Sequence, residues 1–430
     1  MTTLHFDAIV IGLGAIGAAT YYQLAQRGTH VLGIDRFNPP HDQGSSHGQS
    51  RISRLAIGEG DAYVPLVKAS HRIWRELEER PGRQVFTRTG GLILAPRDRI
   101  AAHHGKSDFV RRTIACAERH GIAHEVLDAA EVQRRYPQFQ LQGDELAYFE
   151  RDAGFVRPEE AIAAQLEAGT AAGGQVHANE TVLALAPQPD GTVVVQTDLA
   201  RYTTDRVVVA AGPWLPEFLT RLALSPWLAQ WQGQFKVYRQ VMHWFDVGNR
   251  AAHFAPGTLP IFIWMFGDDQ EDYMYGFPSS DPAQPALKVA TEQYLDTTTP
   301  DTIDRTVAPA ESEAMLRDRV APRIRGVTGQ TIQARACLYT VTPDRQFVID
   351  QLPGTPHVVV ASACSGHGFK HSAGIGEAVR CRCWVGRCST TCRRSGLRGC
   401  SARRDLPAAP FSDQNGFRPR FSLGIQLFFS

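Results

Sequence analysis

Residues 6–36 read FDAIVIGLGAIGAATYYQLAQRGTHVLGIDR. The apolar residues at 8–11 and 31–34 have the composition of buried β-strands, and residues 15–26 carry helical spacing with Leu24 on the buried face. The turn between the first strand and the helix has the order G-x-G-x-x-G, and Gly28 ends the helix. A strand, a glycine-rich turn, a helix and a second strand in this order predict a βαβ unit that binds a dinucleotide.

Each glycine of the turn has a physical role in such a unit. Gly12 allows the tight turn, Gly14 lets the backbone approach a pyrophosphate, and Gly17 lets the helix pack closely on the strand. Asp35 closes the second strand, where its carboxylate can accept hydrogen bonds from ribose hydroxyls. The motif leaves FAD and NAD open as the dinucleotide, whereas Asp35 disfavours the 2′-phosphate of NADP.

Length and charge exclude several classes of protein. The chain has 430 residues, which predicts two domains. Its 45 basic and 44 acidic residues give a formal net charge of +1, so nothing electrostatic favours nucleic acid or an anionic membrane as a partner. The first residues lack the basic start of a signal peptide, and no apolar run is long enough to span a membrane. We therefore predict a cytoplasmic protein.

The chain after residue 39 does not continue as regular βα units. Residues 39–54 are polar and irregular, and segment 277–310, rich in Pro, Asp and Thr, is predicted as a surface loop with one helix. Further patterns predict helices near 64–78 and 107–120, strands at 90–96, 207–211, 238–245 and 273–279, a hairpin turning at 190–191, and a strand, glycine turn and helix over 357–379.

These patterns predict an α/β (α+β) fold. A Rossmann-like cofactor-binding domain made of residues 1–85, 150–222 and 325–385 is interleaved with a mixed β-sheet substrate domain made of residues 86–149 and 223–324. Residues 386–430 form an atypical tail.

Several residues could carry chemistry, although each alone has an ordinary interpretation. His47, Arg51 and Arg54 share one polar loop, and the two arginines either lie on one side of a helical turn or are split between two anions. The other candidates are Tyr275, Lys288, Tyr339 and Lys370. Cys337, in RACLYTVTPD, has no partner cysteine at a zinc or redox spacing, so taken alone it is typical of a buried structural thiol.

Taken together, five stretches resemble one family. GLGAIG with GIDR, PPHDQGSSHGQSRISRLAIGEGDAYVPL, YMYGFPS, ACLYTVTPDRQFVID and SGHGFK are similar, in order and approximate spacing, to the monomeric sarcosine oxidases. This family also contains N-methyltryptophan, pipecolate and fructosyl amino acid oxidases, and the resemblance covers roughly residues 5–380. It implies an FAD-dependent amine oxidoreductase, with FAD attached through an 8α-S-cysteinyl thioether at Cys337. The cofactor-binding domain would then be an FAD-binding domain.

The resemblance also implies roles for the site residues. Arg54 and Lys370 would bind the substrate carboxylate, a pairing that agrees with the chemistry of a guanidinium and an ammonium. Tyr275 and Tyr339 would border the substrate. Catalysis would involve these tyrosines with His47, Arg51 and Lys288, of which Lys288 would activate O₂ and Arg51 or His47 would be the alternative cation. Cofactor contacts would come from Gly12, Gly14, Gly17, Asp35, Arg36, Ser45, Arg51, Cys337, Gly366, His367, Gly368 and Lys370.

The reaction implied is oxidation of an N-methyl (secondary) amino acid such as sarcosine. The N-alkyl C–H is oxidised to an imine that water hydrolyses, and O₂ is reduced to H₂O₂ by a monomeric enzyme. Alternatives within the family are N-methyl-L-tryptophan or L-pipecolate oxidation. Outside it, the alternatives are an NAD-linked dehydrogenase and a flavin-binding protein impaired by its tail.

Some positions depart from the family pattern. Gln49 and Ser50 replace an acidic residue and a threonine, and Glu292 replaces a histidine found a turn after the lysine, which puts sarcosine as best substrate in question. The tail after residue 380 is rich in cysteine and arginine. Its spacings C-x-C, C-x₄-C and C-x₃-C match no zinc pattern and no histidine accompanies them, so we predict no metal.

Overall fold

A computed structural model describes residues 4–221, 233–269, 271–352 and 354–384. Residues 1–383 form one compact unit, described below, while the second unit, 384–430, lies outside the described residues except for Trp384. The tail that was predicted to be atypical therefore lies outside them as well. Among the described residues, no helix combines the length and the apolar character needed to cross a membrane. The monomeric state and the cytoplasmic location stay predictions.

The βαβ unit at the N-terminus is confirmed. β1 (Leu4–Ile11) and β2 (Val31–Ile34) are parallel neighbours, and α1 (Ala15–Ala25) connects them. Leu24 is fully buried, as its position on the helix predicts. The small residues of α1 let it pack against both β2 and α5 (Pro158–Ala171).

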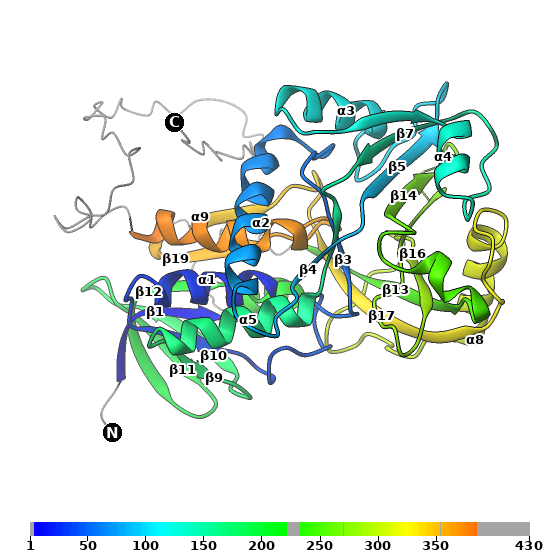
Figure 1. Ribbon diagram of the computed structural model, residues 1–430. Coiled ribbons are helices and arrows are strands. Elements are labelled where there is room, and N and C mark those ends of the chain that lie inside the picture. The colour runs from blue at the N-terminus through cyan, green and yellow to red at the C-terminus, as the bar shows by residue number, and fades with distance from the viewer. Residues whose placement is uncertain (1–3, 222–232, 270, 353, 385–430) are drawn as a thin grey trace, which may run out of the picture. The chain divides into compact units, whose positions relative to one another are not determined.

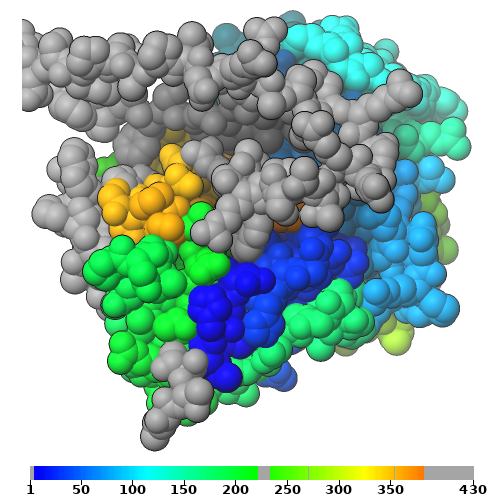
Figure 2. Space-filling model, turned by 90° about the vertical axis from the view of Figure 1, so that its left-hand side faces the viewer, coloured from blue at the N-terminus to red at the C-terminus, as the bar shows by residue number. Residues whose placement is uncertain are grey.

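The first eight-stranded sheet brings together distant segments of the chain. β1 pairs in parallel with β12 (Arg201–Val209), which pairs in parallel with β19 (Thr355–Ser362). Six strands follow the order β10-β11-β12-β1-β2-β9, while β19 also pairs with β12 and β18 pairs with β19. The remaining strands are β9 (Gln175–His177), β10 (Val182–Pro187), β11 (Val193–Thr197) and β18 (Val348–Leu352). The hairpin predicted at 190–191 is the antiparallel pair β10 and β11. Figure 2 shows blue, green and orange segments from distant parts of the sequence side by side on one face.

The second eight-stranded sheet has a different order and is mostly antiparallel (Figure 1). Its order is β17-β13-β16-β15-β14-β5-β7-β6, made of β17 (Thr331–Val341), β13 (Lys236–Asp246), β16 (Ala286–Ala290), β15 (Tyr273–Phe277), β14 (Ile261–Met265), β5 (Gly91–Pro96), β7 (Glu145–Glu150) and β6 (Glu125–Asp128). A three-stranded sheet, β3 (Arg51–Ser53), β8 (Gly154–Val156) and β4 (Phe86–Arg88), completes the strands. The predicted α/β (α+β) fold is confirmed.

The helices that matter for the site are α2 (Val64–Glu78), α3 (Phe109–Arg119) and α9 (Ser372–Trp384), with short 3₁₀ turns η1 (Asp61–Tyr63), η2 (Gly212–Trp214), η3 (Gly248–Phe254) and η5 (Phe369–His371). Shorter helices are α4 (Ala129–Arg135), α6 (Leu215–Arg221) and α8 (Pro309–Met315), which a π-helical turn, Leu316–Val320, follows. The division into two domains stays a prediction. β17 pairs with β13 while β19 pairs with β12, so segment 325–385 supplies strands to both large sheets.

One local prediction is wrong. Segment 277–310 is not a surface loop with one helix, because residues 286–290 form β16, all five are buried, and the next helix begins only at Pro309. The strand forms because β13 and β15 flank it and saturate its backbone hydrogen bonds. Of the two alternatives left open for Arg51 and Arg54, the structure does not have the shared helical turn. Arg51 begins strand β3, and successive residues of an extended chain diverge, so the two side chains separate.

Candidate active site

The glycine turn after β1 is as tight as predicted. Gly12 has φ +85°, and a Cβ there would lie 2.6 Å from the carbonyl oxygen of Ala210. A Cβ on Gly17 would lie 1.7 Å from the carbonyl oxygen of Gly12, so any side chain would push α1 away from the turn. The Asp35 carboxylate accepts the N–H of Leu13 at 2.7 Å and that of Phe37 at 2.8 Å. It therefore fixes the turn from the end of β2.

A large pocket opens beside this turn. Counting its open mouth, it encloses about 1540 Å³. Of the residues predicted to contact the cofactor, Gly12, Gly14, Asp35, Arg36, Ser45, Arg51, Gly366 and Gly368 line it, together with Tyr339. Gly17, Cys337, His367 and Lys370 are not among the lining residues. Gly17 packs against the backbone of Gly12. Lys370 contacts His367 and Glu59 in a buried polar cluster.

Two hydroxyl groups mark the pocket as a site for a polar ligand. The Oγ of Ser45 and the Oγ1 of Thr340 are buried, and neither has a hydrogen-bond partner among the described residues. Both residues line the pocket. Since buried polar atoms are normally satisfied, a ligand with hydrogen-bonding groups fits this wall.

Cys337 lies against this wall. Its Sγ is 3.6 Å from Nη2 of Arg51 and 3.7 Å from the carbonyl oxygen of Ser45. The same Arg51 nitrogen donates to the Ser45 carbonyl at 2.9 Å. Cys337 is only 1% exposed, and its two neighbours line the pocket. The thiol is thus held beside the pocket by a cation and a carbonyl.

His47 is buried, and neither ring nitrogen has a hydrogen-bond partner among the described residues. Burial, reinforced by Arg51, lowers the pKa of His47 to about 3. Its ring is therefore neutral at physiological pH. A neutral ring does not favour His47 as the alternative cation, although its role stays a prediction, while the Arg51 guanidinium is charged.

Lys288 lies between two aromatic rings. The register of β16 places it opposite Trp244 of β13 and Phe277 of β15, and its Nζ lies 5.1 Å and 4.6 Å from the two ring centroids. The Nζ donates to the carbonyl oxygens of Gly48 at 2.6 Å and Ser50 at 2.9 Å. Arg51 donates to the same Ser50 carbonyl at 2.9 Å. Burial, reinforced by Arg51, lowers the pKa of Lys288 well below its usual range.

Arg54 and Lys370 converge on one buried carboxylate, that of Glu59. Arg54 Nη2 lies 2.7 Å from Oε2 of Glu59, and Lys370 Nζ lies 3.3 Å from Oε1. Lys370 also donates to the carbonyl oxygen of His367 at 2.8 Å. Burial lowers the pKa of Lys370 to about 8, although Glu59 opposes the shift. We call Arg54 and Lys370 the clamp.

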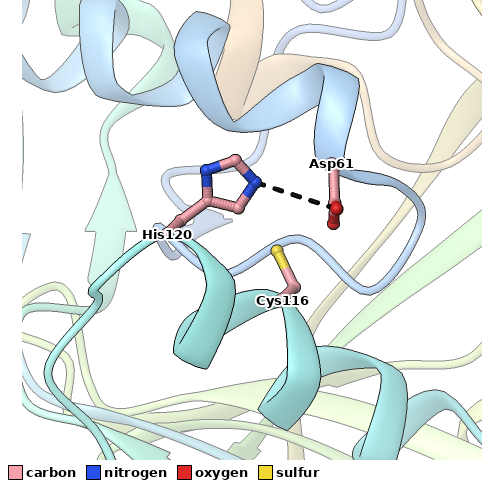
Figure 3. Close-up of side chains that lie close together, drawn as sticks. All are labelled: Asp61, Cys116 and His120. Carbon is pink, nitrogen blue, oxygen red and sulfur yellow. Dashed lines mark ion pairs between the residues drawn. The ribbon is translucent and has the colours of Figure 1, made fainter.

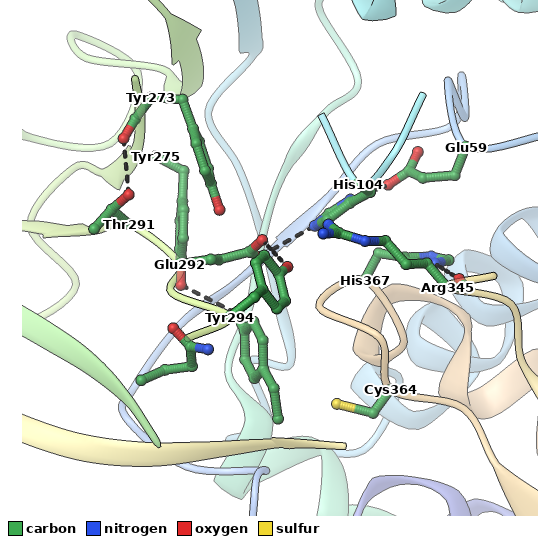
Figure 4. A network of polar contacts seen from close by, with 12 residues as sticks. Glu59, His104, Tyr273, Tyr275, Thr291, Glu292, Tyr294, Arg345, Cys364 and His367 are labelled. Carbon is green, nitrogen blue, oxygen red and sulfur yellow. Dashed lines mark hydrogen bonds and ion pairs between the residues drawn. The ribbon is translucent and has the colours of Figure 1, made fainter. Parts of the chain in front are cut away.

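The clamp continues into a wider polar network (Figure 4). His104 lies between two carboxylates, with Nδ1 3.3 Å from Glu59 Oε1 and Nε2 3.1 Å from Glu292 Oε1. Tyr294 donates its hydroxyl to the other oxygen of Glu292. Glu292, which stands where the related enzymes were expected to have a histidine, is thus buried and paired.

Tyr275 and Tyr339 form the next wall of this region. Their hydroxyl oxygens are 3.2 Å apart, although one tyrosine comes from β15 and the other from β17. Burial raises the pKa of both phenols, so both stay protonated at physiological pH. They can donate hydrogen bonds but cannot add negative charge.

The sequence matches the family model described as FAD dependent oxidoreductase over residues 7–382. The chain belongs to this family. The match decides between the two dinucleotides in favour of FAD. This FAD-dependent oxidoreductase is 39% identical over 375 residues to a protein named monomeric sarcosine oxidase from Streptomyces avermitilis, covering 87% of this chain and 92% of the relative.

A second relative, from Yersinia pestis, is named N-methyl-L-tryptophan oxidase and is 32% identical over 381 residues. The alignment covers 87% of this chain and 94% of that relative. Among solved structures, NikD, described as an unusual amino acid oxidase essential for nikkomycin biosynthesis, aligns with a TM-score of 0.74 at 24% identity, over 90% of this chain and 95% of that one. That likeness shows the fold. The relatives place this FAD-dependent oxidoreductase in the sarcosine oxidase and N-methyltryptophan oxidase group of amine oxidoreductases.

Part of the site of this FAD-dependent oxidoreductase could not be predicted from the sequence. Glu59 lies within a stretch that carried the family resemblance, yet nothing in its spacing shows that it pairs with Lys370, 311 residues away. His104 belongs to an adjacent pair, His103 and His104, which is an unusual local signal, but its two carboxylate partners come from other segments. These residues are brought together by the fold alone.

A separate cluster of Asp61, Cys116 and His120 joins η1 to α3 (Figure 3). Arg119 donates to both oxygens of Asp61 at 2.8 Å, and His120 Nε2 lies 3.9 Å from the same carboxylate. The Cys116 sulfur accepts the N–H of Ile57 at 3.4 Å, and burial raises the pKa of its thiol. Because the arginine occupies the carboxylate, we interpret the cluster as a brace for the segment that carries Glu59.

Proposed function

We propose that this amine oxidoreductase is an oxidase of N-methyl (secondary) amino acids such as sarcosine. The observation that carries the proposal is the clamp, in which a guanidinium and an ammonium already bind one carboxylate in a buried site. A substrate carboxylate has the same chemistry as Glu59 and can be bound by the same two groups. A basic surface patch would not provide this, because solvent would compete for both cations.

In the proposed reaction a hydride would leave the C–H next to the substrate nitrogen and a proton would leave the nitrogen itself. The chemistry that FAD supplies when bound is the transfer of these two electrons to O₂, which would also take up the two protons to give H₂O₂. The imine left behind adds water and breaks down, so sarcosine gives glycine and formaldehyde. Within this chain, Arg54 and Lys370 would hold the carboxylate, and Tyr275 and Tyr339 would border the amine as neutral hydrogen-bond donors.

We further propose that FAD is attached covalently at Cys337 through its 8α carbon. Supporting observations are the position of the sulfur at the pocket wall and the absence of a second cysteine to pair with it among the described cysteines, which are all free. The Arg51 guanidinium, whose Nη2 lies 3.6 Å from the sulfur, would hold the sulfur beside the pocket wall, where it would attack the methyl carbon of the flavin. Joining thiol and methyl group removes two hydrogens, for which O₂ is the oxidant.

Oxygen uptake with a small panel of amines tests the proposed function. Sarcosine should support O₂ consumption with equal amounts of H₂O₂ and formaldehyde. N-methyl-L-tryptophan and L-pipecolate form the comparison, since a relative of this chain is named for oxidation of the first of them. If kcat/KM for either of these is higher than for sarcosine, that amino acid is the preferred substrate and the protein stays in the same group of oxidases. If no N-alkyl amino acid is turned over, the proposal is contradicted.

Replacing Arg54 with methionine is expected to raise KM for sarcosine far more than KM for N-methylethylamine, which lacks the carboxylate. Losing one partner of a buried charge pair typically costs about 2–5 kcal/mol. Steady-state kinetics on both amines measure the effect, and Arg134→Met, at a side chain that is 71% exposed, is the matched control. Equal effects on the two amines would show that Arg54 does not bind the carboxylate.

Binding of acetate should weaken as the pH rises through about 8, because the lowered pKa of Lys370 lies there and the clamp loses one charge above it. Acetate itself stays ionised throughout, so the change reports the protein. The dissociation constant can be followed by the perturbation of flavin absorbance. In Lys370→Met the affinity should be lower, and its dependence on pH above 7 should disappear; a dependence that persists would assign the titration to another group.

A further inference from the structure

Five ionisable side chains of the candidate site contact one another directly: Arg54, Glu59, His104, Glu292 and Lys370. All five are buried, with side-chain exposures of 7% or less. We call them the charge network. It lies at the pocket wall, because a Cβ on Gly366 would be 2.8 Å from His104 Nε2 and 2.9 Å from Glu292 Oε1, and Gly366 lines the pocket.

The geometry fixes the protonation of His104. Each ring nitrogen faces a carboxylate oxygen, and an ionised carboxylate can only accept hydrogen bonds. Both nitrogens must therefore donate, which makes the ring an imidazolium. The pKa of His104 agrees: burial acts to lower it, but Glu292 and Glu59 outweigh burial and raise it.

The two acids of the network are ionised. Burial opposes this, but Arg54 and Lys370 hold the pKa of Glu59 well below its usual range, and His104 does the same for Glu292. With the three cations Arg54, Lys370 and His104 against two anions, the network carries one excess positive charge at neutral pH. One substrate carboxylate neutralises it.

Several other titratable groups lie around the network. His103 and His367 are neutral, because burial lowers the pKa of both. Glu150 lies behind the network and accepts the N–H groups of Leu55 and Ala56, while burial raises its pKa. The Arg345 guanidinium stacks 4.1 Å from the ring centroid of Tyr294, whose hydroxyl donates to Glu292.

We propose that the charge network makes the pocket selective for substrates with a single carboxylate, and that Glu292 is the specificity-determining residue that rejects a second one. This inference rests on the proposed function and narrows it to N-alkyl amino acids with an uncharged side chain. A second carboxylate would enter an already neutral, poorly solvated site beside Glu292 and Glu59, where like charges repel strongly.

The test compares ligands of equal shape and different charge. On the wild-type holoenzyme, N-methyl-L-asparagine should have a kcat/KM at least about 10-fold above that of N-methyl-L-aspartate, a ratio equivalent to about 1.4 kcal/mol. Binding without turnover is measured with succinamate, which has one carboxylate, and with succinate, which has two, through the change in flavin absorbance. The dissociation constant of succinamate should be lower than that of succinate by a similar factor of about 10.

Two variants should move this ratio in opposite directions. Glu292→Gln removes an anion and should abolish most of the preference for the monoanion. His104→Gln removes a cation and should increase it. Glu311→Gln, whose carboxylate pairs with Arg239 outside the network, should leave the ratio at the wild-type value. A purely structural role of Glu292 would weaken both ligands alike and leave the ratio unchanged.

The outcomes separate this inference from the proposed function. Turnover of sarcosine together with equal binding of succinate and succinamate by the wild-type enzyme would overturn the inference alone, even if neither variant folds. An unchanged ratio in a folded Glu292→Gln variant would overturn it as well. Absence of any N-alkyl amino acid turnover, with the preference for succinamate intact, would contradict the proposed function and leave the selectivity standing.

Discussion

Lys288→Met is expected to slow reoxidation of the flavin by O₂ by a factor of about 10²–10³, because that is the usual effect of removing one preorganised electrostatic contact. Reduction by substrate should stay comparatively fast, since Lys288 contacts Gly48 and Ser50 and not the clamp. Stopped-flow traces recorded separately for the anaerobic reductive step and the oxidative step measure the two effects.

The surroundings of Lys288 explain why it would act on oxygen. Its Nζ donates to two carbonyl oxygens and lies over two aromatic rings, so its position is set by the fold before any charge develops. It shares the Ser50 carbonyl with Arg51, which reaches Cys337. Since burial lowers its pKa, the ammonium form is lost as the pH rises, and reoxidation in the wild type should slow in the same direction.

Lys236→Met is the matched control for this prediction. Lys236 begins β13 in the same sheet, but its side chain is exposed. That variant should reoxidise at the wild-type rate. Unchanged reoxidation in Lys288→Met would instead assign the cation near the flavin to Arg51, because His47 is neutral.

Cys337→Ala is expected to abolish covalent attachment of the flavin completely while most of the fold persists. The thiol is small and buried among Met242, Trp244 and other apolar side chains, so removing one sulfur atom costs little packing. After acid precipitation, the wild-type pellet should be yellow and the variant pellet colourless. Mass spectrometry of the peptide containing Cys337 should show the added mass of FAD in the wild type only.

Cys381→Ala provides the control, because Cys381 is an exposed cysteine of α9. It should retain an acid-stable yellow colour. Release of the flavin from wild-type protein by acid would contradict the thioether, although FAD could still be bound without a covalent bond through the glycine turn and Asp35.

The parts of the fold that the sequence predicted well depend on local patterns. The βαβ unit follows from glycine spacing and from apolar periodicity within 30 residues, and α2 spans 64–78 as predicted because its apolar residues repeat at helical spacing. Residues whose roles depend on position in such motifs, including Gly12 and Gly17, are found where close backbone approach excludes a side chain.

The parts that were missed depend on pairing between distant segments. β16 is short and flanked by Pro and Asp, so its own residues do not distinguish a strand from a loop. Only the register with Trp244 and Phe277 shows that Lys288 is buried. The charge network has the same origin, because Glu59, His104 and Glu292 come from three segments and become partners only in the folded chain.

The most direct test of the account is an anaerobic titration of the purified flavin-containing protein with sarcosine, followed by flavin absorbance. We expect the visible absorbance to bleach in proportion to added sarcosine and to return when O₂ is admitted, with one H₂O₂ released for each flavin reoxidised. Flavin absorbance that stays unchanged with sarcosine, N-methyl-L-tryptophan and L-pipecolate alike would contradict it.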